Sequence, residues 1–215
     1  MADETTKKVP INIQIVADFM CLSCWIGKRK LEAAMQQTAD LYDFNVSWEP
    51  FFLFPGLTDE GVEKLPRMKN PSILEQMRQR AASVGIKFSG RSKRLPNTFS
   101  GHQMLEYCKT LDNSTNVQSN VAERIFKNYL CEDQLLNRGV LNKIAEELCF
   151  DMAAYEGYMD CADNSKKVEE TALSWKSKPI PSVPHFIING ETHISGSLEP
   201  DAFAKTFAFI ADNQK

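Results

Sequence analysis

The sequence predicts an α/β protein in which a mixed β-sheet packed with helices is interrupted by a large all-helical insertion. A strand, a helix and a second strand open the chain, a long helical stretch follows, and two strands and a helix close it. Each end would expose sheet edges and an apolar face if it folded alone, so we expect the two ends to form one sheet. The predicted domains are a discontinuous one, residues 1–56 and 178–215, and an inserted helical one, residues 57–177.

The opening unit is predicted from hydrophobic periodicity. Residues 11–17 alternate apolar and polar side chains, which indicates a strand, and helical spacing follows over about 22–40. A second alternating run begins at Phe44, with Pro50 at an edge or a bulge because proline cannot donate a ladder hydrogen bond. A strand, a helix and a strand within about 45 residues predict a βαβ unit with parallel strands.

The middle of the chain has helical patterns and neither a repeat nor a low-complexity segment. Residues 57–70 and 86–96 combine charges with Gly or Pro and lack periodicity, so we expect loops there. The expected helices cover about 71–84, 100–111, 117–129, 141–148, 152–161 and 168–175.

The end of the chain returns to β-structure. Asn189-Gly190 is a strong hairpin signal, and the apolar residues on either side of it predict two short strands within residues 184–196. A final helix should begin at Glu199.

Two cysteines, Cys21 and Cys24, lie where the first strand turns into the first helix. They share one helix face, and a Cα separation of roughly 5 Å at this spacing fits a disulfide. The free N–H groups and the positive dipole end of the first helical turn stabilise a thiolate, so Cys21 should titrate below about 8.5 and act as the nucleophile. Cys24, deeper in the helix, should be shielded and act as the resolving thiol. Lys28 and Arg29 lie one to two turns further on, and we expect them to contribute little.

Two other interpretations of the pair are a zinc half-site and incidental core cysteines. A zinc site needs a second close set of ligands, but the chain has no second CxxC and only three histidines, so we expect no metal. Buried free thiols are the plain interpretation of the remaining cysteines, and a second disulfide or a shuttle pair is the alternative for Cys108, Cys131, Cys149 and Cys161.

Val183-Pro184 opens the predicted hairpin. A proline at the entry to a core strand removes a ladder donor, and a cis peptide bond would explain its presence there. The Val183 backbone would then face the cysteines, where an extended substrate could pair with it.

Composition limits the classes of function. The net charge is −3 with 43% hydrophobic residues, which gives no reason to expect a nucleic acid or a membrane surface as a partner. Residues 1–9 are polar, no apolar signal core follows them, and we expect a cytoplasmic protein, in which structural disulfides are rare.

Three motifs together resemble the DsbA family of thioredoxin-fold proteins, and within it the cytosolic FrnE-like branch. The resemblance covers nearly the whole chain, and it is carried by Asp18-Phe19-Met20-Cys21-Leu22-Ser23-Cys24-Trp25-Ile26-Gly27-Lys28-Arg29, Leu95-Pro96-Asn97-Thr98-Phe99-Ser100-Gly101-His102, and Val183-Pro184-His185-Phe186-Ile187-Ile188-Asn189-Gly190 with Ser195-Gly196.

The resemblance implies a thioredoxin fold with a helical insert, a thiol–disulfide oxidoreductase activity and a mixed disulfide on the nucleophilic cysteine. It implies catalytic roles for Cys21 and Cys24 and a cis proline at 184. Candidate substrate-binding residues are Val183, Pro184, His185, Trp25 and His102. For His102 a packing role is the alternative, and for His185 an exposed strand position.

The sequence departs from the family pattern in one informative way. Members of this branch usually have Cys-Pro-Trp-Cys, whereas Leu22-Ser23 stands here, so the redox direction stays open. Kappa-class glutathione transferases and 2-hydroxychromene-2-carboxylate isomerases look similar but carry serine where Cys21 stands. A glutathione-dependent transferase or isomerase is therefore the alternative function, and a binding or chaperone-like module is a third. We expect no tightly bound cofactor, and glutathione is a candidate co-substrate. The expected substrate is a thiol or disulfide, either of a protein or of a small molecule. Both a monomer and a homodimer are consistent with the sequence.

Overall fold

The computed structural model describes residues 8–112 and 114–213. Its centre is a four-stranded sheet in the order β2-β1-β5-β6, formed by Val9–Ala17 (β1), Tyr42–Pro50 (β2), His185–Ile188 (β5) and Thr192–Ser195 (β6). β1 is parallel to β2 and antiparallel to β5, which in turn is antiparallel to β6. The predicted mixed sheet is thus confirmed, and Pro50 ends the edge strand β2, where its missing N–H interrupts nothing.

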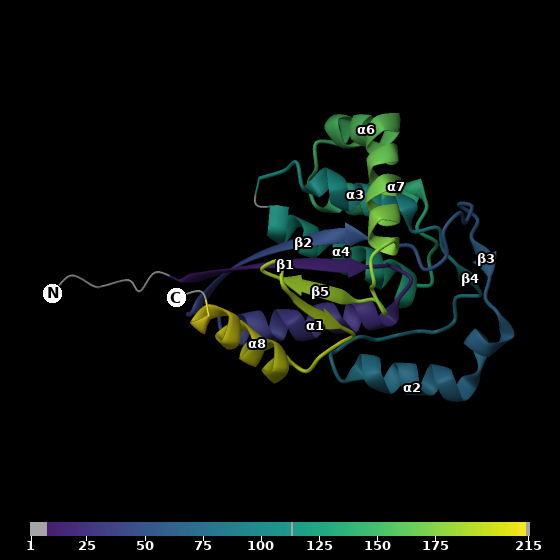
Figure 1. Ribbon diagram of the computed structural model, residues 1–215. Coiled ribbons are helices and arrows are strands. Elements are labelled where there is room, and N and C mark those ends of the chain that lie inside the picture. The colour runs from purple at the N-terminus through teal and green to yellow at the C-terminus, as the bar shows by residue number, and fades with distance from the viewer. Residues whose placement is uncertain (1–7, 113, 214–215) are drawn as a thin grey trace.

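Two helices, Leu22–Gln37 (α1) and Pro200–Asp212 (α8), lie together on one side of this sheet (Figure 1). Their apolar faces meet the sheet through a group of aromatic rings: Phe186 of β5 packs edge-on against Phe203 of α8, with ring centroids 5.0 Å apart. Both rings are fully buried. This packing fixes α8 against β5, and α1 in turn packs against α8.

The helical insertion enters the chain after β2 and leaves it before β5. Its helices α3, α6 and α7 lie on the side of the sheet opposite α1 and α8 (Figure 1). The bounds of the six α-helices are Pro71–Ala82 (α2), Phe99–Cys108 (α3), Ser114–Leu130 (α4), Arg138–Glu147 (α5), Met152–Asp160 (α6) and Ala162–Lys176 (α7). No helix in the part of the chain that the structure describes is long and apolar enough to cross a membrane.

The predicted helical insertion is confirmed, and it also contains a short antiparallel pair within residues 57–70 and 86–96, where the sequence predicts loops. Val62–Glu63 (β3) pairs antiparallel with Arg94–Leu95 (β4), and a 3₁₀-helix, Pro66–Lys69 (η1), follows β3. Strands of two residues are too short to show an alternating pattern. Gly61 makes the pairing possible, because its φ is +64° and a Cβ there would lie 2.1 Å from the Leu95 carbonyl oxygen.

The proposed domain limits at 56/57 and 177/178 stay a prediction. Residues 1–7 and 214–215, which belong to the discontinuous domain in that division, lie outside the described residues.

Candidate active site

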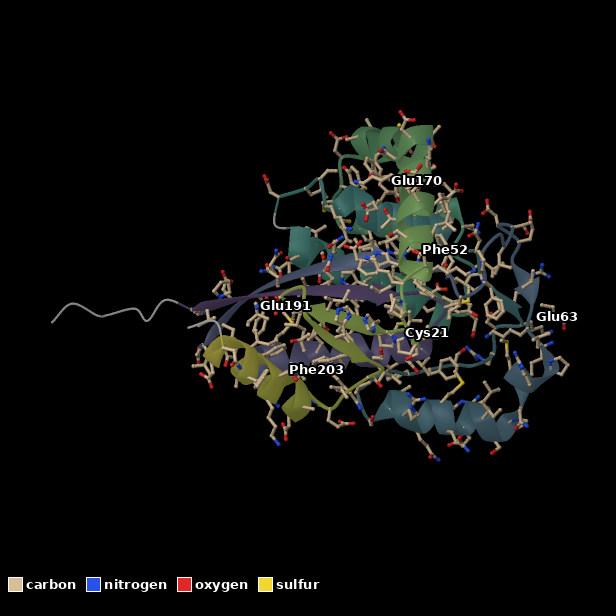
Figure 2. The ribbon with its side chains drawn as sticks, viewed as in Figure 1. Cys21, Phe52, Glu63, Glu170, Glu191 and Phe203 are labelled. Atoms are coloured by element: carbon tan, nitrogen blue, oxygen red, sulfur yellow. The ribbon has the colours of Figure 1, made fainter. Side chains whose placement is uncertain are left out.

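Cys21 occupies the N-cap position of α1 and has extended backbone angles, φ −92° and ψ 107°. The turn after β1 delivers it there: the Cys21 amide donates to the Asp18 carbonyl oxygen at 3.0 Å, and the Cys24 amide to the Cys21 carbonyl oxygen at 3.0 Å. Cys21 is half-buried, Cys24 is fully buried one turn further on, and both are free thiols. Figure 2 shows Cys21 at the end of α1 that faces β3 and α2.

The environment lowers the pKa of Cys21 from its ordinary value. The largest cause is a hydrogen bond from the Cys24 side chain; burial opposes it, and the backbone amides of Cys24 and Ser23 add to the lowering. The negative charge of Asp18 acts in the opposite direction. The predicted direction for Cys21 agrees with these contacts.

Burial raises the pKa of Cys24 well above its ordinary value, and the hydrogen bond and charge of Cys21 raise it further. The two thiols therefore differ in both accessibility and acidity. Cys21 has the exposure and the lowered pKa of an attacking thiolate, whereas Cys24 stays protonated beneath it.

The segment before β5 lies against Cys21. The Val183–Pro184 peptide bond is cis, in agreement with the sequence prediction. The Cys21 thiol lies 3.8 Å from the Val183 carbonyl oxygen, to which it donates a long hydrogen bond. Gly27 of α1 allows this approach, because a Cβ at that position would lie 2.8 Å from Cγ of Pro184. The structure thus brings together the first and third motifs of the sequence.

A buried acid behind the cysteines was missed by sequence reasoning. Asp18 is fully buried, and its carboxylate accepts hydrogen bonds from the Leu53 amide at 2.8 Å and the Met20 amide at 3.3 Å. Nε2 of His102 lies 3.9 Å from the Asp18 carboxylate and has no hydrogen-bond partner among the residues that the structure describes. A signal was present in the sequence, since an aspartate directly after a buried strand and three residues before a cysteine is an unusual position for a charge.

His102 itself is buried and therefore faces Asp18 rather than an open groove. Its ring packs between those of Phe19 and Phe52, at centroid distances of 4.7 Å and 5.4 Å. A role for His102 in substrate binding stays a prediction.

Trp25 and His185 are also buried. The indole N–H of Trp25 donates to Glu123 of α4 at 2.9 Å, and its ring stacks on that of Phe126 at 5.9 Å, so Trp25 lies at the contact of α1 with the insertion. Nδ1 of His185 is hydrogen bonded across the hairpin to the Ser195 hydroxyl at 2.7 Å. Its Nε2 is hydrogen bonded to Nδ1 of His193, also on β6, at 3.0 Å. The ring nitrogens of both residues are thus occupied by Glu123, Ser195 and His193.

The four remaining cysteines are free thiols spread through the insertion. Cys108 is fully buried, and burial raises its pKa to about 12. Cys131 and Cys161 are half-buried, and Cys149 is exposed. Among the described residues, no three His, Cys, Asp or Glu side chains are grouped as metal ligands.

A βαβ–ββα sheet with a helical insertion, and two cysteines at the first helix N-terminus facing a cis proline, define a protein of the thioredoxin-fold class. Comparison with known families makes this specific. The family described as "DSBA-like thioredoxin domain" matches residues 12–208, and the chain belongs to it.

Individual relatives agree with this assignment. The chain is 28% identical to a Bacillus subtilis (strain 168) protein, YwbO, over 95% of this chain and 98% of that one. It superposes on a probable DsbA oxidoreductase from Streptomyces coelicolor with a TM-score of 0.79 at 16% identity, covering 95% of this chain and 91% of that one. The cytosolic disulfide reductase DsbM from Pseudomonas aeruginosa, with GSH, gives a TM-score of 0.66 at 14% identity, covering 93% and 98%. At these identities the two structures support the fold alone.

Proposed function

We propose that this DsbA-family protein is a thiol–disulfide oxidoreductase that uses Cys21 and Cys24 as its redox pair. The Cys21 thiolate attacks a substrate disulfide, forms a mixed disulfide and releases one substrate thiol. Cys24 then attacks Cys21, which releases the second thiol and leaves a Cys21–Cys24 disulfide. The reverse sequence oxidises a substrate dithiol. The observation that carries the proposal is the contrast between a half-exposed Cys21 of lowered pKa and a buried Cys24 of raised pKa.

The surrounding residues support this chemistry in two ways. In the proposal, Val183 and Pro184 position the substrate chain beside Cys21, since the Val183 carbonyl already lies against the sulfur. Trp25, His185 and His102 are buried, and in the proposal they support the site by packing α1, β5 and the insertion around it.

The proposal is tested by trapping the mixed disulfide. Cys24→Ser should accumulate one equivalent of substrate on Cys21, seen as an added mass on the Cys21 peptide, whereas Cys21→Ser should accumulate none. In the unaltered protein, titration in glutathione buffers should give a Cys21–Cys24 disulfide. A potential near the thioredoxin value, about −270 mV, would define a reductase, and one near the DsbA value, about −120 mV, an oxidase. If no Cys21–Cys24 disulfide forms at any ratio of buffers, the proposal is wrong.

We also propose that the protein works in the cytoplasm and that glutathione is its co-substrate. The Pseudomonas aeruginosa relative, described as cytosolic and solved with GSH, supports this choice. Reduced glutathione should then return the oxidised pair to the dithiol with saturable kinetics. Saturable glutathione binding in Cys21→Ser together with a transferase activity that survives the substitution would instead support the glutathione-dependent transferase or isomerase.

A further inference from the structure

A pocket of about 360 Å³ lies next to the turn between β1 and α1 that leads into Cys21. Met20, which precedes Cys21 in the chain, forms part of its wall, and Arg80 of α2 reaches the Ser23 hydroxyl at 3.3 Å, which brings α2 to the N-terminus of α1. In Figure 1, β3, β4 and α2 form an arm of the insertion beside that end of α1. The volume lies within the range of about 300–1,000 Å³ that small-molecule sites occupy.

The lining is almost entirely apolar. Its floor is made of buried side chains and its wall of half-buried ones, three of them methionines, which adapt to ligands of different shape. Three further lining residues, Leu53, Phe54 and Ile73, are large hydrophobic side chains that are exposed. The remaining lining residues include Met20, Met68, Leu74, Met77, Phe88, Leu95, Tyr129 and Leu130. Apolar surface concentrated in this way beside a reactive thiol indicates a binding site.

Two cations, Lys64 and Arg67, belong to the same lining. Within the described residues neither forms an ion pair, whereas Lys69 on the same 3₁₀-helix pairs with Glu63 at 2.5 Å. Lys64 lies over the Tyr129 ring, 5.3 Å from its centroid, and burial lowers its pKa. The carboxylate that acts on Lys64 from a distance, that of Asp133, is already bound to Arg91 at 3.2 Å. Arg67 is exposed and Lys64 is half-buried, so both cations are accessible to a ligand anion, which could pair with them at the mouth of the pocket.

We propose that this pocket binds the substrate of the redox pair, and that the substrate is a small disulfide with an apolar body and a carboxylate. This inference rests on the proposed function, since it places the substrate's sulfur at Cys21. The apolar body would lie among the methionines and the carboxylate at Lys64 and Arg67. Cys21 attacks one substrate sulfur, the other leaves as a thiolate, and Cys24 displaces the bound half as a thiol, so that one disulfide is reduced for each Cys21–Cys24 disulfide formed.

The test compares disulfides that differ in their negative charge and in whether they contain an aromatic ring. The dithiol protein is mixed with dithiobis(nitrobenzoate), an aromatic dianion, with the uncharged aromatic dithiodipyridine, and with glutathione disulfide, which is anionic and has no apolar body. Single-turnover rates at Cys21 are measured for the unaltered protein and for Lys64→Gln/Arg67→Gln. We expect the double substitution to slow the aromatic dianion about tenfold and to leave dithiodipyridine within about twofold. A tenfold change equals about 1.4 kcal/mol.

Matched controls separate the pocket from general surface effects. Lys69→Gln removes a charge from the same segment and should leave all three rates unchanged. Ile73→Gln should slow both aromatic probes and spare glutathione disulfide, whereas Leu41→Gln, in the loop between α1 and β2 and more exposed than Ile73, should change nothing.

The outcomes distinguish this inference from the proposed function. If the double substitution slows all probes equally or none, the pocket does not select a carboxylate and the inference is wrong, while the redox pair stands. An apolar peptide disulfide that outpaces the aromatic dianion, with no effect of Lys64 and Arg67, would likewise overturn it. If instead no probe yields a Cys21–Cys24 disulfide even in the unaltered protein, the proposed function itself fails.

Discussion

Gly27 shows how one residue sets the geometry of the site. A Cβ added there would lie 2.8 Å from Cγ of the Pro184 ring and 3.1 Å from the Phe186 ring. Neither ring can move away as a flexible chain end could, so we expect Gly27→Ala to cost about 1–3 kcal/mol of unfolding free energy, the typical range for an overpacked core. Urea unfolding measures the loss.

A second glycine supplies the control for this prediction. Gly157 lies in α6, and an added Cβ there meets nothing within 4 Å. Gly157→Ala should therefore stabilise the protein by about 0.5–1 kcal/mol, the ordinary gain from replacing glycine in a helix. Equal gains from both substitutions would show that α1 does not need a glycine against Pro184.

The acidity of Cys21 depends on its partner thiol. Because the hydrogen bond from Cys24 is the largest cause of the lowered pKa, Cys24→Ala should move the pH midpoint of Cys21 alkylation upward. Cys24→Ser keeps a donor of similar size and should move the midpoint less. Iodoacetamide rates between pH 5 and 10, read on the Cys21 peptide by mass spectrometry, measure both shifts. An unchanged midpoint in Cys24→Ala would assign the low pKa to the helix N-terminus instead.

The residues of the site that can be predicted from the sequence are those whose roles depend on neighbouring positions in the chain. Spacing and helix position suffice to place Cys21 and Cys24, and the relation of Cys21 to Val183 was predicted from a motif 162 positions away in the chain. The contact between Asp18 and His102 could not be predicted in this way. It depends on how α3 packs against the end of β1, and neither residue belongs to a pattern that predicts the other.

At the scale of elements, periodicity decides what can be predicted. Asn189 and Gly190 both have positive φ, 50° and 79°, which is the turn that their sequence predicts. The apolar stripe predicts this helix at about 168–175, whereas α7 begins at Ala162, because residues 163–167 are all polar and show no stripe. The β3–β4 pair has two residues in each strand and no stripe at all.

The β5–β6 hairpin should respond to acid through His185. Burial lowers the pKa of His185, and the charge of His193 on β6 lowers it further, so the folded hairpin favours the neutral His185 ring. A depressed folded pKa means that the unfolded chain binds the proton more readily. The stability that depends on the neutral ring is complete above the unfolded value, about 6.5, and is lost as the pH falls through the folded pKa.

The lowered pKa of His185 predicts a difference in how the melting temperatures of two proteins depend on pH. Between pH 7.5 and 5, the melting temperature of the unaltered protein should fall more than that of His185→Gln, which cannot take up the proton and keeps an amide toward Ser195. Parallel curves for the two proteins would show that His185 does not couple protonation to folding.

At the scale of the whole molecule, one carboxylate, that of Glu123, links the insertion to α1. Glu123 of α4 accepts from the Trp25 indole at 2.9 Å, from Lys28 at 3.0 Å and from Arg29 at 2.5 Å, all on α1. Burial raises the pKa of Glu123, but the charge of Lys28 and the hydrogen bonds from Trp25 and Lys28 outweigh it and hold the pKa below its usual range. The insertion is thus tied to the helix that carries both cysteines.

Removing this charge should loosen the attachment. Lys28 is only 3% exposed, and among the described residues Glu123→Gln leaves it Glu32, at 2.7 Å, as its one charged partner. Loss of one partner of a fully buried pair costs about 3–5 kcal/mol, and because Glu32 remains and Glu123 is partly exposed, we expect about 2 kcal/mol. Urea unfolding measures this loss, and Glu132→Gln, which breaks an exposed pair with Lys127, should cost less than about 0.5 kcal/mol.

The same substitution tests whether the insertion and the cysteine pair act as one unit. If Glu123 fixes α1, its replacement should raise the alkylation rate of Cys24, which is fully buried in the intact protein. Glu132→Gln should leave that rate unchanged. A stability loss without any change at Cys24 would mean that α1 is held by the sheet and α8 alone, and that the insertion serves the substrate without controlling access to the resolving thiol.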